Sequence, residues 1–424
     1  MKEKKKKYAG TALRTVGLGL ITGAADDDCS AIGTYAQVGA QLGYKALWTA
    51  PVILPMMMAT VYLAGKLGQV TGKGLFGVLR CHYPRSLIYL FLVGVIIGNT
   101  IEAGADIGGI SAAIGIFLPL PRWAILLSIT AIILSLQLWG SYAVIRNIFR
   151  ILAMSLLGYI GSAYLARPDL HKVIHGTLLP TLSFNKETLS LLVAIVGTSL
   201  SAYLYTWQSN EEVEEQREED PHAPPRPRET SETQLHRAGW DVIWGMLFSN
   251  LVMYSIILAA AATLFISGKH NITSASEAAE SLVPLAGRAA SLLFATGIVG
   301  VGFLSVPVMT IGASYDLCQT MGWKNGLHFS PRQAKRFYGA IIFITLIAMG
   351  LNFFNINPMH GLVLAGIVQG FSSPPLMFLI MHMTNKRSIM GPHVNGRWIN
   401  IMGWTTTIVI FAASIGLIFS WFLS

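Results

Sequence analysis

Three consecutive carboxylates, Asp26, Asp27 and Asp28, lie in the otherwise apolar, small-residue segment GLITGAADDDCSAIGTYAQVG, residues 19–39. Successive helix residues project about 100° apart, so a continuous helix cannot turn all three toward one cavity. Glycines flank the aspartates, and Asp, Cys and Ser are poor helix formers whose side chains compete for their own backbone. We therefore expect the helix to unwind at this point.

A helix that unwinds inside a membrane exposes backbone carbonyls, and it is tolerated only where it lines a protein cavity. Carboxylates beside free carbonyls form a cation site, and an ionisable residue in a span marks function by default. Asp28 is the predicted cation ligand. For Asp26 and Asp27 two interpretations stay open, helix capping or a charged approach to the site. Cys29 is either a soft ligand or a small residue at the unwound point.

The composition indicates an integral membrane protein. Of 424 residues, 53% are hydrophobic and 12% are charged, whereas soluble domains carry about twice that charged fraction. Apolar runs of about 18 residues or more recur along the chain, each long enough to cross a bilayer. The net charge of +9 suits cationic membrane loops, so we expect a lipid bilayer and no nucleic acid as partner. The three separated cysteines suggest neither a disulfide framework nor a paired-cysteine metal site.

We predict an all-α integral membrane protein with about eleven spans. A basic N-terminus, residues 1–10, precedes a first five-helix repeat over 11–166, a second over 188–384 and an eleventh helix over 398–422. The segment 210–238 is charged and proline-rich, which predicts a mobile polar loop. The predicted spans are residues 11–41, 46–66, 86–116, 121–143, 147–166, 188–209, 239–266, 284–320, 337–356, 358–384 and 398–422.

The basic residues are unevenly shared between the two sides that these spans define. Of the 30, seven fall opposite the N-terminus and the other 23 fall on its side. Cytoplasmic loops carry an excess of Lys and Arg, so the bias predicts a cytoplasmic N-terminus and an outer C-terminus. The seven are Lys45, Arg122, Arg167, Lys172, Lys186, Lys269 and Arg288.

Span six repeats the pattern of span one. Thr198 and Ser201 lie in a small, hydroxyl-rich island of AIVGTSLSAYLYTWQS, residues 194–209, so a second break is expected there. If the repeats are inverted, the two breaks meet at one midplane site. In span three, Glu102 and Asp106 are four residues apart on one helix face, where a buried carboxylate pair readily holds a proton and could relay it. Gln369 in span ten is a weaker site candidate.

The stretch DCSAIGTYAQVGAQLGY resembles the first-span motif of the NRAMP family of divalent-metal transporters, in which Asp-Pro-Gly-Asn precedes a similar run. The resemblance places Asp28 at the metal-binding aspartate, Cys29 at the proline, Ser30 at the glycine and Ala31 at the asparagine. It implies a LeuT-like fold of two inverted five-helix repeats, with helices one and six broken and one extra helix.

In span six, Ser201, Ala202 and Tyr203 take the places of the family's Met-Pro-His. Thr198 then falls where a backbone carbonyl contacts the metal, and Asp106 resembles the third-span glutamate associated with proton movement. The chain is similar to the divergent branch with motifs Asp-Pro-Ser-Gly and Ser-Pro-Tyr, some members of which move Mg2+ or Mn2+. Loss of the methionine removes the soft ligand that favours transition metals, and the roomier site suits a metal that keeps several waters.

These patterns predict a secondary transporter of divalent cations, Mn2+ or Mg2+, working by alternating access, with no resident cofactor. Tyr203 in place of histidine leaves open whether H+ accompanies the metal. The alternative is a sodium-coupled symporter of a small organic solute on the same fold, and a non-transporting sensor is a third reading. An enzyme is not expected, because no His-Glu-x-x-His pattern occurs. We expect a bacterial-type plasma membrane; the oligomeric state stays open and a monomer is compatible.

Overall fold

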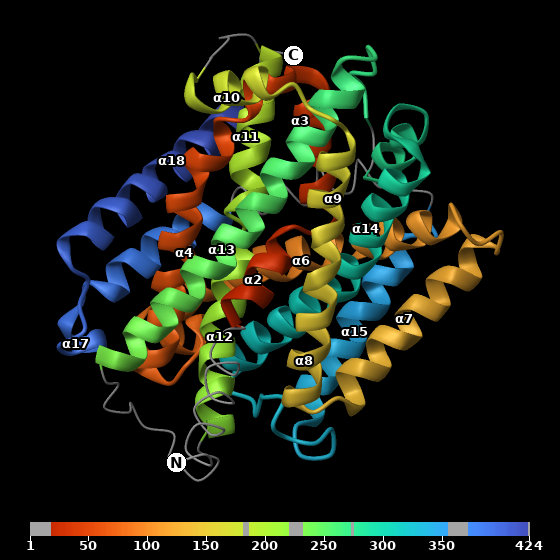
Figure 1. The fold of residues 1–424 in the computed structure, drawn as a ribbon. Coiled ribbons are helices and arrows are strands. Elements are labelled where there is room, and N and C mark those ends of the chain that lie inside the picture. Colours follow the sequence, from red (N-terminus) through yellow and green to blue (C-terminus); the bar gives the residue numbers. More distant parts are fainter. Residues whose placement is uncertain (1–17, 181–185, 220–231, 273–274, 355–371, 423–424) are drawn as a thin grey trace, which may run out of the picture.

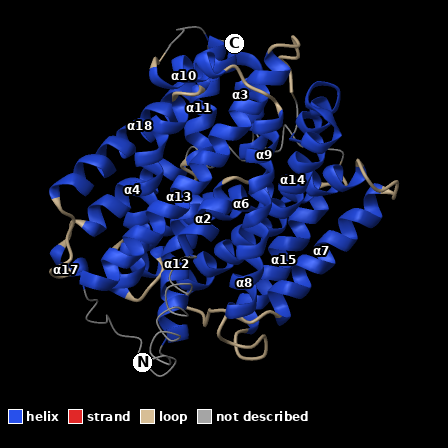
Figure 2. Ribbon diagram, viewed as in Figure 1, coloured by secondary structure: helices blue, strands red, loops and turns tan. Residues whose placement is uncertain are grey.

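The computed structural model describes residues 18–180, 186–219, 232–272, 275–354 and 372–422, which fold into helices and their connections without a strand (Figure 2). The first part holds α2 (Leu18–Asp26), α3 (Cys29–Leu42), η1 (Gly43–Ala46), α4 (Thr49–Thr71), α5 (Leu75–His82), α6 (Arg85–Gly115), α7 (Arg122–Trp139), α8 (Tyr142–Ala153), η2 (Met154–Leu156), α9 (Leu157–Leu165) and α10 (Leu170–Leu178). The second part holds α11 (Lys186–Ser199), α12 (Ala202–Glu219), α13 (Glu232–Ala260), η3 (Ala261–Phe265), α14 (Ala275–Met321), α15 (Lys335–Leu351), α17 (Arg387–Met390) and α18 (Arg397–Phe422), and residues 372–384 are also helical.

Eight helical segments of the described residues are long and apolar enough to cross a membrane. The first predicted span is not among them, because its two halves, α2 and α3, have only 9 and 14 residues. The predicted count of eleven therefore stays a prediction, as do the repeat boundaries.

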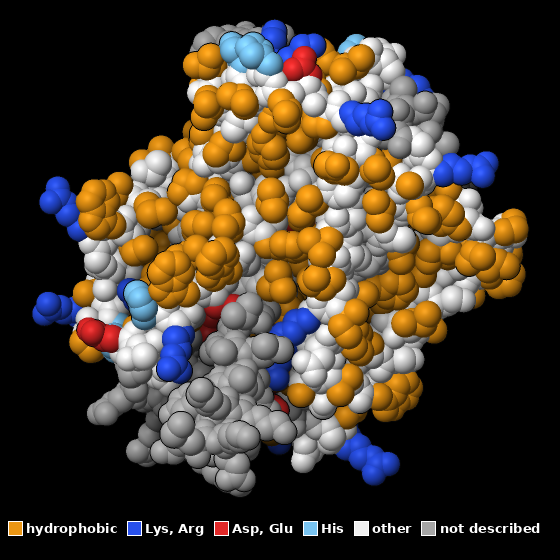
Figure 3. Space-filling model, viewed as in Figure 1, with side chains coloured by type: hydrophobic (Ala, Val, Ile, Leu, Met, Phe, Trp, Pro, Cys, Tyr) orange, Lys and Arg blue, Asp and Glu red, His pale blue; other side chains and the backbone are white. Residues whose placement is uncertain are grey.

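The outer surface is apolar in the way that a bilayer requires. Hydrophobic side chains cover the middle of the visible face in Figure 3. Large apolar groups such as Leu90 and Trp139 are 67% and 79% exposed, and soluble monomers rarely expose large contiguous apolar patches. The chain is a multi-pass membrane protein.

The bundle has two ends, which Figure 1 places at the top and bottom of the view. We call them the α10 end and the α12 end, after the short helix at the top and the helix that finishes at the bottom. At the α10 end, Asp169 caps α10: the backbone N–H groups of Lys172 and His171 donate to its carboxylate and hold its pKa below the usual range.

The half-span α2, which leads into the aspartates, contacts α13, α12, α8 and α14. The half-span α2 packs along α13, while α12 lies against α4, and α6 lies against α14 (Figure 1). The α2 and α13 backbones approach closely at Gly19 and Gly245, since a Cβ on either glycine would overlap the other helix's backbone. The aspartates are thus held at the centre of the molecule.

The predicted polar loop over 210–238 is wrong at both ends. Residues 210–219 belong to α12 and residues 232–238 to α13, while 220–231 lie outside the described residues. The prediction from charged composition fails because Glu211, Glu212 and Glu214 are buried and have polar partners, such as Tyr142 of α8 and Gln69 of α4.

Candidate metal-binding site

The helix breaks at the aspartates, as the sequence predicts. The first half, α2, ends at Asp26, and α3 begins at Cys29, so Asp27 and Asp28 form the turn between them. Asp28 is the N-cap of α3 with extended backbone angles, φ −61° and ψ 176°, and its Oδ1 accepts the Ala31 N–H at 2.8 Å. An aspartate at this position satisfies an otherwise unpaired backbone donor, so Asp28 helps to start the helix.

Asp28 and Asp26 have partners on different helices. Asp28 Oδ2 accepts from the Tyr203 hydroxyl of α12 at 3.2 Å, and Asp26 Oδ2 accepts from the Ser249 hydroxyl of α13 at 3.3 Å. Neither oxygen of Asp27 has a hydrogen-bond partner within the described parts of the chain. All three are buried, with at most 2% of the residue exposed. The three carboxylates therefore do not share one set of hydrogen-bond partners.

The second break is also present. The helix α11 ends at Ser199, Leu200 and Ser201 are not helical, and α12 begins at Ala202. The Tyr203 hydroxyl, on the first turn of α12, donates to Ala25 O at 2.7 Å as well as to Asp28. Tyr203 thus joins the two breaks at one buried point.

Thr198 and Ser201 are turned toward their own helix. The Ser201 hydroxyl lies 3.0 Å from both Gly197 O and Thr198 O, and the Thr198 hydroxyl donates to Ala194 O at 3.0 Å. Ala31 contributes its backbone N–H to Asp28 and a buried methyl group. Thr198, Ser201 and Ala31 therefore lie beside the two breaks. The hydroxyls of Thr198 and Ser201 contact carbonyls of their own helix and not the Asp28 carboxylate.

Glu102 and Asp106 of α6 both reach the start of α3. The Ser30 hydroxyl lies 2.7 Å from Asp28 Oδ1 and 3.3 Å from Glu102 Oε1. Asp106 Oδ1 accepts the Cys29 N–H at 3.1 Å, and its Oδ2 accepts from the Ser305 hydroxyl of α14. The two carboxylates are thus linked to the aspartate turn through separate partners.

The thiol of Cys29 is turned away from Asp28. Its Sγ lies 3.8 Å from Ile298 O and 4.0 Å from Asp106 O, which are carbonyl acceptors on α14 and α6. This contact fits a small residue at the turn better than a metal ligand. Gln369 lies outside the described residues.

Sequence reasoning missed four hydroxyl groups that complete the surroundings, namely those of Ser30, Ser249, Ser305 and Tyr35. Tyr35 OH and Ser199 Oγ are 2.8 Å apart and join α3 to α11. No local pattern distinguishes these serines from others in apolar spans, because their role depends on contacts between distant helices. Within the described ranges no group of three or more His, Cys, Asp or Glu side chains is placed to hold a metal. A cation here would therefore use neutral oxygen donors beside the carboxylates, as Mg2+ and Mn2+ do.

Comparison with known proteins decides the family. The profile described as "Natural resistance-associated macrophage protein-like", Nramp, matches residues 19–420. The chain belongs to the Nramp family. A Klebsiella pneumoniae (strain 342) protein named divalent metal cation transporter MntH is 26% identical over 383 residues, covering 89% of this chain and 87% of that protein.

Solved structures share the fold. The manganese transporter of Eremococcus coleocola, in complex with a bis-isothiourea compound, has a TM-score of 0.73 at 19% identity, covering 96% of this chain and 86% of that one. A sodium-coupled sialic acid symporter, captured substrate-bound and outward-open, has a TM-score of 0.58 at 10% identity and covers 93% and 88%. The predicted all-helical, LeuT-like fold class with two broken helices is therefore confirmed for this Nramp chain.

The α12 end of this Nramp chain is closed by a buried polar network. Glu212 accepts from Gln69 of α4 at 2.8 Å and from Gln208 at 2.9 Å. Gln208 in turn accepts from the Thr22 hydroxyl of α2 at 2.5 Å. This chain of hydrogen bonds ties α2, α4 and α12 together below the aspartates.

A second part of the network joins α12 to α8. The Tyr142 hydroxyl lies 3.2 Å from Glu211 Oε2 and 3.1 Å from Glu215 Oε2, and Arg146 forms an ion pair with Glu215. The side chain of Glu214 is only 1% exposed, and its Oε2 lies 3.0 Å from Nδ1 of His328. These contacts explain why so polar a sequence forms a buried helix.

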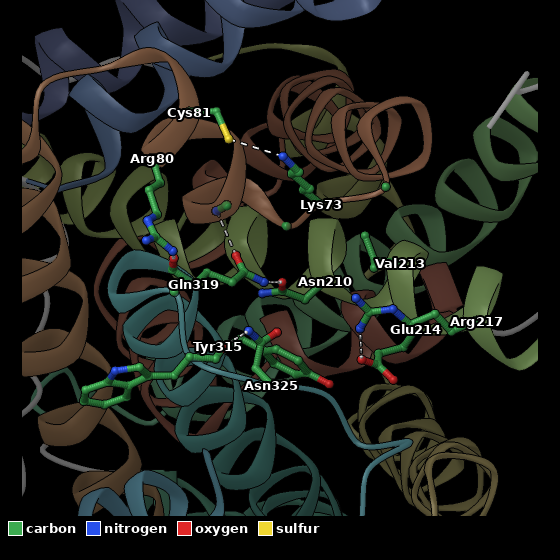
Figure 4. A pocket seen from close by; sticks show the side chains of 15 residues that line it. Lys73, Arg80, Cys81, Asn210, Val213, Glu214, Arg217, Tyr315, Gln319 and Asn325 are labelled. Carbon is green, nitrogen blue, oxygen red and sulfur yellow. Dashed lines mark hydrogen bonds and ion pairs between the residues drawn. The ribbon is translucent and has the colours of Figure 1, made fainter. Parts of the chain in front are cut away.

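A cavity of about 360 Å³ lies beside this network, between α5 and residues of α12 and α14 (Figure 4). Gln319 of α14 donates to Asn210 Oδ1 at 2.6 Å and accepts the Gly77 N–H at 3.0 Å, so it links α12 to α5. Three basic side chains, Lys73, Arg80 and Arg217, line the cavity beside the single carboxylate of Glu214, which does not favour a metal site.

Proposed function

We propose that this chain is a secondary transporter that moves divalent metal cations, Mn2+ or Mg2+, across a membrane by alternating access. The observation that carries the proposal is the position of Asp28, a buried carboxylate at the point where the two helix breaks meet. Its oxygens are held by groups of α3 and α12. The name of the MntH relatives and the fold of the manganese transporter support the same substrate class.

The metal ligands we propose are the Asp28 carboxylate and oxygens at the second break, among them the Thr198 carbonyl. The Tyr203 hydroxyl orients Asp28. Oxygen donors without a methionine thioether favour a hard cation that keeps part of its water shell. A carrier of organic solutes is disfavoured, because the symporters of such solutes share only the fold and the relatives of greater identity are named for metal cations.

Alternating access requires that the site open to one side at a time. The site is buried in this structure, and the α12 end is closed by the Thr22, Gln208 and Glu212 contacts. We assign the α12 end to the cytoplasm of a plasma membrane, because Lys73, Arg80 and most other basic residues lie on that side of the predicted spans. Proton movement through Asp106 is the associated hypothesis, since Asp106 touches the start of α3 directly.

The test is uptake of Mn2+ and Mg2+ into proteoliposomes, with wild type beside Asp28→Asn and an internal pH dye. We expect uptake by wild type and a loss of at least tenfold in Asp28→Asn. The exposed Asp169→Asn variant is the control for a missing carboxylate and should transport normally. Equal uptake by wild type and Asp28→Asn would contradict the site. A dye response that accompanies metal uptake and disappears in Asp106→Asn would support the relay.

A further inference from the structure

Asp26 and Asp27 carry carboxylate oxygens that no described residue satisfies. Both residues are 0% exposed. Asp26 Oδ2 accepts from Ser249, but within the described ranges Asp26 Oδ1 and both oxygens of Asp27 have no hydrogen-bond partner. Asp28, by contrast, is held through both oxygens. Among the three aspartates of the described turn, the oxygens without a hydrogen-bond partner therefore belong to Asp26 and Asp27.

A tyrosine from another helix adds an independent indication. Tyr159 of α9 is 0% exposed, and its hydroxyl has no hydrogen-bond partner among the residues that the structure describes. Its ring packs edge-on against Phe294, with the centroids 4.7 Å apart, so packing fixes the position of the hydroxyl. Tyr159 interacts electrostatically with Cys29 and, more weakly, with Asp27. Buried hydroxyl groups normally have a hydrogen-bond partner, so an unpartnered one near the aspartates is a candidate oxygen donor.

Among the residues that the structure describes, none of the groups given as acting on the two aspartates carries a positive charge. The groups that interact with Asp26 and Asp27 are Asp28 and Ser249, with the tyrosines Tyr35, Tyr159 and Tyr205 facing them. Two adjacent buried carboxylates without a counter-ion are strongly unfavourable. A divalent cation neutralises both, and three free carboxylate oxygens with a hydroxyl provide the hard donors that Mn2+ and Mg2+ take.

We propose that Asp26 and Asp27 bind a second divalent cation at the break, on the side facing α13 and α9, with the Tyr159 hydroxyl as a further oxygen donor and water in the remaining positions. This inference rests on the proposed function, because it gives the same substrate class a second site. The two sites are separate, since Asp28 is turned toward α12 and α6 through Tyr203 and Ser30. The second ion holds the turn between α2 and α3 together.

The experiment is Mn2+ titration of the purified full-length chain in lipid nanodiscs, read as bound ions per chain. We expect two Mn2+ in wild type. One should remain in Asp28→Asn, and one should remain in the double variant Asp26→Asn with Asp27→Asn. A single Mn2+ in wild type that persists unchanged in the double variant overturns the second site. Loss of all binding in Asp28→Asn overturns it too, because the sites would not be independent.

This design also separates the second site from the proposed function. If Asp28→Asn transports normally but the double variant loses one ion, the second site stands and the transport assignment of Asp28 fails. If transport needs Asp28 and the double variant keeps both ions, the transport assignment stands and the second site fails.

Two further measurements apply if the double variant does not fold. Tyr159→Phe removes only the hydroxyl, and we expect at least tenfold weaker binding of one Mn2+. The matched control is Tyr338→Phe on α15. In wild type the Tyr338 hydroxyl donates to Phe329 O at 2.8 Å, and this variant should bind Mn2+ as wild type does. In wild type itself, two Mn2+ ions held at one break should broaden each other's paramagnetic resonance spectrum. The spectrum of isolated Mn2+ at saturation, or equal binding by Tyr159→Phe and wild type, contradicts the proposal.

Discussion

At the scale of single residues, three aspartates side by side in the sequence have three different surroundings. Asp28 caps α3 and contacts Tyr203, Asp26 contacts Ser249, and Asp27 has no hydrogen-bond partner in the described structure. A metal bound at Asp28, as we propose, would have to replace or rearrange the hydrogen bonds that already hold its carboxylate. We therefore expect metal affinity to depend on the residues that position this carboxylate as well as on the metal ligands.

Tyr203→Phe tests this positioning role. The substitution removes the hydroxyl that donates to Ala25 O and Asp28 Oδ2 and leaves the ring in place. Loss of a residue that orients a metal ligand typically weakens metal affinity by about 10-fold to 100-fold. We expect that loss in Mn2+ binding by calorimetry, with a higher KM for uptake. Unchanged affinity would show that Tyr203 does not orient Asp28. Tyr338→Phe serves again as the matched control.

The sequence predicts the place of the two breaks but not the partners of each aspartate. Glycine, aspartate and serine near residue 28, and the small residues near 198, are local signals of weak helix formation. The roles of Ser249 and Tyr159 come from α13 and α9, more than 100 residues away. No local pattern identifies them, because only the packed bundle brings their hydroxyls to the turn.

At the scale of elements, α2 is the half-span whose packing closes the site toward the α12 end. Its backbone meets α13 at Gly19 and Gly245, and the Gly19 N–H donates to Asp241 of α13 at 2.7 Å. Glycine is required there because a Cβ on Gly245 would overlap the Gly19 backbone. Without a side chain between them, the two helices can pack closely enough to bury the aspartates.

Gly245→Ala should therefore open the α12 end. Alanine favours helix by about 1 kcal/mol over glycine, but here its methyl group must push α2 away from α13. We expect Cys29, which is buried, to react with a maleimide several-fold faster in Gly245→Ala, measured by mass spectrometry in a Cys81→Ser background. Gly350→Ala on α15 is the control, because a Cβ there meets no other atom within 4 Å. Equal rates in all three proteins would contradict a closing role for this contact.

The wrong prediction of a loop over 210–238 is also an element-scale result. Composition alone describes EEVEEQREE as solvated, yet Glu212 and Glu215 accept from Gln69 and Arg146 inside the bundle. Charged residues are rarely buried unless they are paired, and pairing depends on tertiary structure. Sequence patterns therefore predict the apolar spans, but they do not predict that the charged end of α12 is a helix packed in the bundle.

At the scale of the whole molecule, an apolar middle and two polar ends define how the chain lies in a bilayer (Figure 3). The hydrophobic spans could be predicted from the lengths of the apolar runs, because the thickness of the bilayer sets the length of each helix that crosses it. The direction of crossing is predicted from the charge bias alone, since the predicted spans would put 23 of the 30 basic residues on the side of the N-terminus.

Cysteine labelling tests this orientation directly. Cys81 of α5 is exposed at the α12 end, whereas Cys29 and Cys318 are buried, so a wild-type chain offers one reactive thiol among its three. In intact bacterial cells a membrane-impermeant maleimide should leave Cys81 unlabelled, while a permeant one labels it. Lys172→Cys, made in a Cys81→Ser background, places a thiol at a site with 60% side-chain exposure at the α10 end and should react with the impermeant reagent. The reverse pattern would place the α12 end outside, so that the Thr22, Gln208 and Glu212 contacts would close the outer rather than the cytoplasmic side of the site.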